Sequence, residues 1–315
     1  MLRVDFINVG YGDSILIRAM EQDVTYYTML IDAGDTDDAA HYEQGRIRTV
    51  DYLAEAGVER INTLLLTHLH KDHVGGMPAV ISKFPVEQVV AGYYPPEAAL
   101  SPEKKFVHYK DGALSLARGA DAWRVSVSIL RANGTTCTKL ADCEGRIELA
   151  PGLTVSYLQG WKDGNERQKR IFDRLLGPES GPTEGELLQL DRFINNLSIT
   201  LVLEHQGLKI ALLGDVYLGF WREHSIPENC RIVKLPHHGH ADAVSEELLR
   251  TLSPDWAVVS VSNDRTDDCP CARLADMTDI AQIECTDRVR PFNSAGGKAL
   301  RFDVTQDRIA MARVE

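Results

Sequence analysis

Residues 63–77 read TLLLTHLHKDHVGGM, and this stretch decides how the chain is interpreted. Its apolar run is typical of a buried strand, and His68, His70, Asp72 and His73 follow within six positions. On an extended segment, residues two apart point the same way, so we expect His68 and His70 to face one side. Imidazole together with carboxylate is a ligand set for divalent transition metals. The alternative, a solvated polar loop, does not explain why three of the ten histidines in the chain lie beside one strand end.

The surrounding sequence alternates between strand and helix patterns. Strands are predicted for the apolar or alternating segments 2–9, 14–19, 26–34, 58–67, 87–94, 126–132, 153–158, 231–239 and 256–262, and for hairpins at 195–215 and 296–314. Helical spacing predicts helices at 47–57, 75–84, 112–123, 217–224 and 245–252. We expect residues 159–186, which are charged and rich in Gly and Pro, to form a surface excursion or a lid. Strands that alternate with helices predict an α/β fold.

The composition excludes some classes of protein. The chain has 315 residues, 44% hydrophobic and 25% charged, with a formal net charge of −12. That is an ordinary globular composition, and the acidity argues against a broad basic surface for nucleic acid. The sequence shows no signal-peptide pattern, and no apolar run approaches the ~20 residues of a membrane span. The six cysteines form no dense even framework, so we expect reduced thiols and a cytoplasmic protein. Cys269 and Cys271 with Cys285 make only a weak half of a zinc site.

Several segments together resemble a known family. The sequence HLHKDH at 68–73, followed by two glycines, fits the HxHxDH motif of the metallo-β-lactamase fold superfamily. FINVGYGDSILI at 6–17, IDAGD at 31–35, the pair of strands at 195–215 and RIVKLPHHG at 231–239 resemble, in order, the ComEC-type branch, a soluble domain found on DNA-uptake proteins. The resemblance implies a four-layer αββα sandwich with two mixed β-sheets and outer helices. It also implies one domain over 1–315, with a variable insertion at about 95–190.

The resemblance further implies a site for two divalent metal ions, Zn or Mn. The ligands carried over from the family motifs are His68, His70, Asp72, His73, Asp215 and His238. In this pattern His68 and His70 bind the first ion. Asp72 and His73 bind the second, and Asp72 also counts as a catalytic residue.

The remaining implied roles concern the late part of the chain. Asp215 takes the place of the bridging carboxylate, and His238 is the last ligand because it directly precedes a glycine. His237 either holds His238 or acts as a general acid toward the substrate. Asp32 resembles the buried aspartate that orients the histidine loop.

One expected ligand is absent from the sequence. Asn195 and Asn196 stand where many members of the superfamily carry a further histidine, and an amide is a poorer ligand for a transition metal. The first ion is therefore expected to be weakly held, exchangeable or completed by substrate. Asn195 would support the site, and Asn196 would donate a hydrogen bond to a substrate phosphate. We expect His205 to lie at the surface. We expect His240 to be exposed to solvent, with an added contact to substrate as the alternative.

The predicted function is hydrolysis of a phosphodiester by a hydroxide shared between the two ions, with His237 protonating the leaving group. The substrate would be single-stranded, short or cyclic, and would be nucleic acid or a nucleotide. Lys162, Arg167, Lys169 and Arg170 form either a phosphate-binding patch or a solvated surface. A carbonyl substrate, such as a lactone or thioester, is the first alternative. A sensor or partner-binding module, working with a protein partner from an operon-encoded system, is the second.

Overall fold

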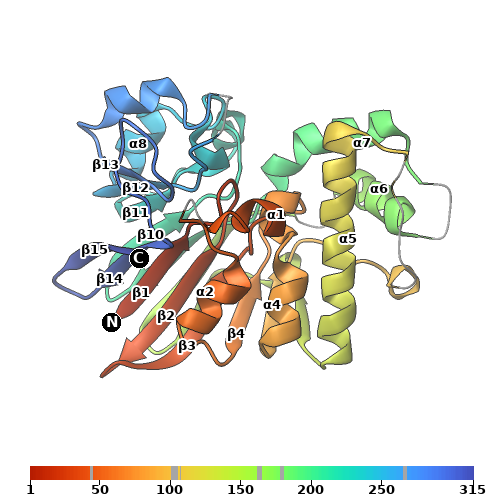
Figure 1. Ribbon diagram of the computed structural model, residues 1–315, viewed down its shortest axis with the longest axis horizontal. Helices are drawn as coiled ribbons and strands as arrows, with labels where there is room; N and C mark the ends of the chain where they lie inside the picture. Colours follow the sequence, from red (N-terminus) through yellow and green to blue (C-terminus); the bar gives the residue numbers. More distant parts are fainter. Residues whose placement is uncertain (43–44, 101–105, 107, 162–164, 178–180, 265–267) are drawn as a thin grey trace.

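The computed structural model describes residues 1–315 except 43–44, 101–105, 107, 162–164, 178–180 and 265–267. Two β-sheets pack on one another, with helices on their outer faces (Figure 1). This arrangement confirms the predicted αββα sandwich with two mixed sheets. In the described part of the chain, no helix has the length and apolar character needed to cross a membrane.

The first sheet has eight strands in the order β15-β14-β1-β2-β3-β4-β5-β6. Its strands are β1 (Leu2–Ile7), β2 (Ile15–Glu21), β3 (Val24–Ile31), β4 (Ile61–Leu65), β5 (Val86–Ala91), β6 (Thr136–Lys139), β14 (Ala299–Val304) and β15 (Ile309–Val314). From β15 to β3 the neighbours are antiparallel, and from β3 to β6 they are parallel. Nearly every residue of β1 and β2 is buried, because both faces of the sheet are covered.

The second sheet has seven strands in the order β13-β12-β11-β10-β9-β8-β7. Its strands are β7 (Arg146–Ala150), β8 (Leu153–Gln159), β9 (Thr200–His205), β10 (Leu208–Leu212), β11 (Cys230–Lys234), β12 (Trp256–Val259) and β13 (Gln282–Cys285). Neighbours from β7 to β10 are antiparallel, and those from β10 to β13 are parallel. The hairpin between β9 and β10 turns at Gln206 and Gly207, as the sequence predicted.

The described helices and turns connect and cover these strands. The α-helices are α1 (Thr36–Ala39), α2 (Thr49–Glu55), α3 (Lys71–Val74), α4 (Met77–Lys83), α5 (Asp111–Ala132), α6 (Glu166–Leu176), α7 (Glu184–Ile194) and α8 (Glu246–Leu252). The 3₁₀ turns are η2 (Glu97–Ala99), η3 (Leu140–Asp142), η4 (Asn195–Leu197), η5 (Leu218–Arg222), η6 (Pro236–Gly239) and η7 (Ala272–Met277).

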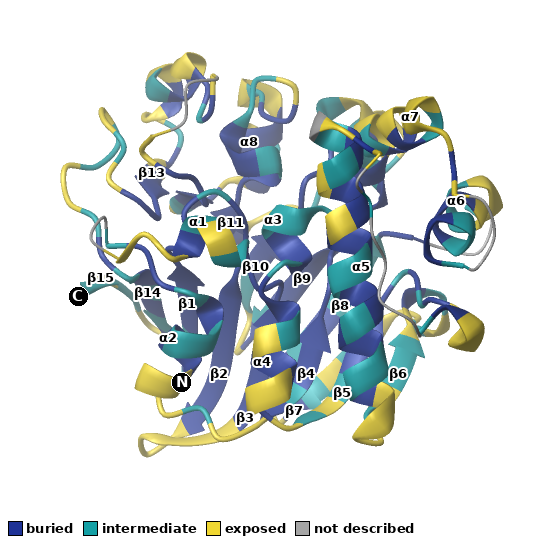
Figure 2. Ribbon diagram, turned by 45° about the vertical axis from the view of Figure 1, so that its right-hand side comes forward, coloured by how far each residue is buried: buried dark blue, intermediate teal, exposed yellow. Residues whose placement is uncertain are grey.

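Three apolar cores separate the four layers. The first lies between the first sheet and α2, α4 and α5, where Trp123 is fully buried. The second lies between the sheets, where Phe6 of β1 and Leu203 of β9 are fully buried. The third lies between the second sheet and α8, where Leu249 is fully buried. Figure 2 shows the buried strands beneath α4 and α5, whose outer surfaces carry exposed residues.

Two segments fold differently from their prediction. Residues 126–132, predicted as a strand, form the last part of α5, because Ala120, Trp123 and Val127 belong to one buried helical stripe. Residues 159–186, predicted as a surface excursion, contain α6 and the start of α7. The charged outer face of α6 concealed an apolar stripe that is buried in the first core. Of the missed strands, β6 and β7 are short and half-exposed, so their apolar pattern is weak.

The fold brings together the carboxyl ends of four strands. β3 and β4 are parallel neighbours in the first sheet, and β10 and β11 are parallel neighbours in the second. Asp32 follows β3, residues 68–73 follow β4, Asp215 follows β10 and His238 follows β11. Because parallel neighbours end at the same edge, all four segments meet where the two sheets lie together.

Candidate metal centre

The loop after β4 carries the first pair of donor atoms. His70 directly precedes α3, which turns the chain back at the strand end. His68 is buried, and its Nε2 lies 3.1 Å from Nδ1 of His70. Two imidazole nitrogens that present lone pairs to one another at this distance repel unless a proton or a cation lies between them. The pair is therefore suited to a cation.

A second group of donor atoms converges on a neighbouring point. The Nε2 atoms of His73 and His238 lie 3.1 Å and 3.2 Å from Oδ2 of Asp215. Oδ2 of Asp72 lies 3.2 Å from Nε2 of His238 and 3.7 Å from Nε2 of His73. Nε2 of His238 is buried and has no hydrogen-bond partner among the described residues. These four side chains can therefore surround one ion.

Oδ2 of Asp215 faces both groups, since it also lies 3.9 Å from Nε2 of His68. Zinc binds nitrogen and oxygen at about 2.0–2.2 Å, so tetrahedral ligands around one ion stand roughly 3.3 Å apart. The observed separations between donor atoms are close to that value. The side chains therefore fit two divalent ions that share the Asp215 carboxylate.

Hydrogen bonds behind the rings fix which nitrogen of each histidine faces the centre. Nδ1 of His73 donates to Oδ2 of Asp32 over 2.7 Å, and Nδ1 of His238 donates to a backbone carbonyl over 2.8 Å. Nδ1 of His68 lies 3.1 Å from Oγ1 of Thr67, whose hydroxyl donates to Asp32. Each ring thereby keeps Nε2 and its lone pair for a metal. Asp32 contacts His73 and Thr67 of the histidine loop, and the orienting role that the resemblance implied for it stays a prediction.

Backbone strain accompanies this arrangement. Asp32, His237 and His238 have φ values of 55°, 48° and 53°, in the left-handed region that side chains other than glycine rarely adopt. Each such residue costs on the order of 1–3 kcal/mol, and the surrounding structure must hold it. Here the strained backbone aims the Asp32 carboxylate and the His238 ring at the centre.

A buried lysine adds positive charge beside the bridging carboxylate. Lys234, the last residue of β11, pairs with Oδ2 of Asp13, and its Nζ lies 3.3 Å from Oδ1 of Asp215. Both partners of the first pair are buried. Lys234 thus holds Oδ1 of Asp215 and leaves Oδ2 turned toward the histidines. Sequence reasoning missed both residues, although a lysine at the end of an apolar strand before a double histidine was an available signal.

The protonation of the histidines shows how strongly the centre requires positive charge. Burial opposes a charged His238, but Asp215 and Asp72 outweigh burial and raise the pKa of this ring to about 9. Burial also lowers the pKa of His73, but the nearby carboxylates, of which Asp215 has the largest effect, raise it above its usual value. Burial lowers the pKa of His68, so this ring stays neutral and can bind metal. In the metal-free protein, protons partly balance the carboxylates that divalent ions would neutralise.

A second acidic cluster lies behind the centre. It consists of Asp13, Asp32 and His73, with donor atoms within 4.8 Å of one another. Asp32 already accepts from His73, and Asp13 already pairs with Lys234, so we assign this cluster to holding the ligands. Cys269, Cys271 and Cys285 are buried and belong to neither ligand cluster of the described residues.

The segment that replaces the expected histidine forms a network of hydrogen bonds. Nδ2 of Asn195 donates to the hydroxyl of Tyr217 over 2.9 Å, and Oδ1 of Asn196 accepts from the backbone of Tyr217 over 3.0 Å. Oγ of Ser198 accepts from the backbone N–H of Asp215 over 3.1 Å. Asn195 thus supports a phenol beside the centre, and Asn196 can approach a substrate only through its amide nitrogen.

His237 lies at the rim of the centre. Its Nδ1 is 3.0 Å from Oδ1 of Asp242, and its ring meets the edge of Tyr217 at 5.2 Å. His240, predicted to be exposed, is half-buried and stacks on His237 at 4.5 Å. The prediction for His205 was wrong: the ring is buried, and its Nδ1 lies 3.0 Å from a backbone carbonyl. β9 is an inner strand of its sheet, so its last residue is covered.

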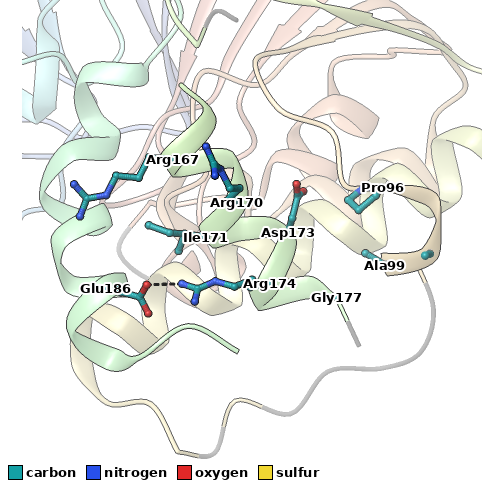
Figure 3. A pocket seen from close by; sticks show the side chains of 10 residues that line it. Pro96, Ala99, Arg167, Arg170, Ile171, Asp173, Arg174, Gly177 and Glu186 are labelled. Carbon is teal, nitrogen blue, oxygen red and sulfur yellow. Dashed lines mark hydrogen bonds and ion pairs between the residues drawn. The ribbon is translucent and has the colours of Figure 1, made fainter. Parts of the chain in front are cut away.

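The described members of the predicted basic patch lie on α6, and Lys162 falls outside the described residues. Figure 3 shows Arg167, Arg170 and Arg174 around one surface pocket of about 720 Å³. Glu186 pairs with Arg174 in the same pocket. None of the residues that line the pocket is a predicted metal ligand, and the phosphate-binding patch stays a prediction.

The amino-acid sequence is similar to a family model and to two known proteins. The family model of the Metallo-beta-lactamase superfamily matches residues 7–154, which include the histidine loop. Over 270 residues, 82% of this chain, the sequence is 23% identical to ComE operon protein 3 of Bacillus subtilis. The family match over residues 7–154 supports the resemblance to the metallo-beta-lactamase superfamily that the sequence motif indicated. It is also 42% identical over 66 residues, 21% of this chain, to hydroxyacylglutathione hydrolase of Stenotrophomonas maltophilia. The matches cover 28% and 25% of those two proteins, so the chain spans about a quarter of their length.

Solved structures of the metallo-beta-lactamase fold extend the likeness to the whole chain. Zn(2+)-bound PqqB from Methylobacterium extorquens has a TM-score of 0.50 and 13% identity, covering 96% of this chain and 100% of that one. YhfI from Bacillus subtilis has a TM-score of 0.50 and 8% identity, with the same coverage. At these identities the likeness shows the fold alone. The fold and the cluster of histidine and aspartate side chains agree with the family match over residues 7–154.

Proposed function

We propose that the protein is a metal-dependent phosphodiesterase acting on single-stranded, short or cyclic substrates, either nucleic acid or nucleotides. The observation that carries the proposal is a contact at the rim of the centre. There Nδ2 of Asn195 donates to the hydroxyl of Tyr217, in the segment where the resemblance implies a further histidine for the first ion. Such a rim offers hydrogen bonds to the non-bridging oxygens of a phosphate. The likeness to ComE operon protein 3 over most of the chain supports the same branch.

The ligand side chains prepare the centre for a charged substrate. Two divalent ions bound there supply a water of lowered pKa and positive charge beside the phosphate oxygens. Asp215 is held by Lys234 on one oxygen and offers the other to both positions. The hydroxyl of Tyr217 accepts from Asn195, so its own proton remains for a phosphate oxygen.

His237 is our candidate for the group that protonates the leaving alkoxide. Nδ1 of His237 is engaged by Asp242, so Nε2 is the nitrogen that can pass a proton to substrate. Asp242 has the orienting role that carboxylates play behind catalytic histidines. Sequence reasoning named His237 but missed Asp242, which lies four residues beyond His238 on the same loop.

The choice of substrate rests on charge. A formal net charge of −12 disfavours tight binding of duplex nucleic acid, whose affinity comes mainly from phosphate contacts. A short or single-stranded substrate needs few contacts beyond the two ions, and therefore fits this chain better.

A carbonyl substrate is the second candidate, because the 66-residue match to hydroxyacylglutathione hydrolase is 42% identical. The same two ions and the same residues at the rim would serve the attack of a hydroxide on the carbonyl carbon of such a substrate. The amide at Asn195 argues for the phosphodiester, since it leaves the first ion with fewer permanent ligands and more room for phosphate oxygens.

The decisive experiment compares wild type with Asp72→Ala, each stripped of metal with a chelator and then reloaded with Mn or Zn. Both proteins are offered bis(p-nitrophenyl) phosphate, single-stranded DNA and a thioester. We expect cleavage of the two phosphodiesters that depends on added metal and disappears in the variant. Turnover of the thioester alone would move the assignment to the carbonyl candidate.

A second comparison tests His237. Nitrophenolate leaves without a proton, whereas the alkoxide of DNA needs one, so His237→Gln should lose about 10²–10⁴-fold on DNA and little on the nitrophenyl ester. Equal losses on both substrates would exclude His237 as the acid.

A further inference from the structure

The ring of His70 has a carboxylate behind it, and that carboxylate comes from a distant helix. Nε2 of His70 lies 3.2 Å from Oδ1 of Asp191, which is on α7, while its Nδ1 faces Nε2 of His68. We propose that Asp191 is a positioning residue that fixes His70 for binding the first ion. The helix α7 thereby becomes part of the metal centre, although it lies outside the residues that the family model matches.

Packing between helices holds Asp191 in place. α7 begins with a capping box formed by Thr183 and Glu186, and its buried residues include Leu187 and Leu190. It packs along α5, where a Cβ at Gly112 would lie 3.1 Å from Oδ2 of Asp191. A carboxylate supported by two packed helices keeps its position without relying on a loop.

The neighbouring histidine shows what such a carboxylate does. At His73, Asp32 accepts from Nδ1 and leaves Nε2 for the metal. At His70 the geometry is reversed: the carboxylate approaches Nε2 and leaves Nδ1 for the metal. Oδ1 of Asp191 is the carboxylate oxygen close to Nε2 of His70, although it is not aligned for a hydrogen bond, and Nε2 has no hydrogen-bond partner among the described residues. Asp191 is therefore the group that can select this tautomer.

The first ion depends on His70 more than the second ion depends on any one ligand. Its implied ligands are His68, His70 and the shared Asp215, whereas the second position has Asp72, His73, His238 and Asp215. An acceptor behind a metal-binding histidine also raises the basicity of the ring. The loss of Asp191 should therefore weaken the first position selectively.

The test uses zinc binding and needs no substrate. Purified wild type, Asp191→Asn, Asp191→Glu and Glu184→Gln are titrated with a chromophoric chelator, and the zinc retained per chain is counted. Glu184→Gln is the matched control, because it makes the same change of charge at the start of the same helix. We expect Asp191→Asn to lower the affinity of the protein for one of the two zinc ions by about 10–100-fold. Asp191→Glu should restore part of that loss, and the control should match wild type.

Thermal unfolding of the metal-free proteins separates positioning from a structural role. The side chain of Asp191 is 31% exposed, so Asp191→Asn should unfold at the wild-type temperature. Wild-type affinity for both ions in Asp191→Asn would overturn the inference, as would an equal loss at both positions with a lowered unfolding temperature. The inference rests on the metal centre of the proposed function and not on its substrate. Failure to cleave phosphodiesters therefore leaves it standing, and unaltered zinc binding refutes it whatever the substrate.

Discussion

The substitution Gly119→Ala, which adds one methyl group to α5, should disturb the metal centre through the backbone of the histidine loop. Gly119 lies where α5 crosses the histidine loop. A Cβ there would press on the carbonyl oxygen of Leu69 and lie 3.0 Å from the nitrogen of Lys71 and 3.2 Å from the carbonyl carbon of His70. These are backbone atoms, so no side chain can turn aside, and the loop must retreat by about 1 Å to reach an ordinary contact of 3.4 Å. Metal–ligand distances tolerate only about 0.2 Å.

The expected magnitude follows from two opposing terms. Overpacking costs about 1–3 kcal/mol, while alanine in place of a helical glycine returns about 1 kcal/mol. We therefore expect Gly119→Ala to lose up to about 2 kcal/mol of the free energy of unfolding. At about 2–4 °C per kcal/mol, the midpoint of thermal unfolding falls by up to about 8 °C. Because the shift moves His70, zinc content should fall as well.

Calorimetry in excess chelator measures the midpoint of thermal unfolding of the metal-free protein. Plasma emission measures the zinc that each protein retains after dialysis. Gly185→Ala on α7 is the matched control, because a Cβ there meets nothing within 4 Å. That variant should match wild type or unfold at a slightly higher temperature. If Gly119→Ala behaves like Gly185→Ala in both measurements, the reasoning about the contact between α5 and the loop is refuted.

Three further predictions concern the centre and its supports. Asp72→Ala and His238→Ala should each lose zinc and activity with unchanged circular dichroism, and a fully active, metal-free Asp72→Ala protein would contradict the assignment. In the metal-free protein the raised pKa of His238 stabilises the fold fully below pH 6.5, and this stabilisation disappears as the pH rises through about 9. Urea unfolding in chelator at several pH values should show that decline, and added zinc should abolish it. Arg46→Leu should cost about 3–5 kcal/mol, because this fully buried guanidinium pairs with Asp38, Asp264 and Asp287. In the same urea assay, Arg48→Leu at an exposed pair should cost at most about 1 kcal/mol.

The sequence predicted the parts of the fold whose pattern is local. Strands such as β1, β4 and β10 carry clear apolar patterns and end in glycine or polar turns, so their positions followed from periodicity. The end of α5 was misread because Ser126, Val127 and Ser128 alternate like a strand, and only packing against the first sheet decides for a helix. α6 was missed because its charged outer face dominated its composition.

In the candidate site, too, the sequence predicted the residues that lie close together along the chain and missed a residue that only packing brings near. His68, His70, Asp72 and His73 lie within one short segment, so their chemistry was evident without any tertiary information. Asp191 stands more than a hundred residues from His70 on a helix that the sequence did not reveal. No periodicity or spacing connects such residues, because only the packing of α5 against α7 brings them together.

The origin of the ligands in two different sheets has a mechanical consequence. Residues 68–73 extend from β4 of the first sheet, whereas Asp215 and His238 extend from β10 and β11 of the second. Between the sheets, the core consists of apolar side chains, whose contacts have little directional preference and permit small sliding movements. Bound ions would cross-link the two sheets at one edge of this interface and would resist sliding of one sheet over the other. Removal of metal should then speed amide hydrogen exchange at the carboxyl ends of β4, β10 and β11, while the opposite edge keeps its protection.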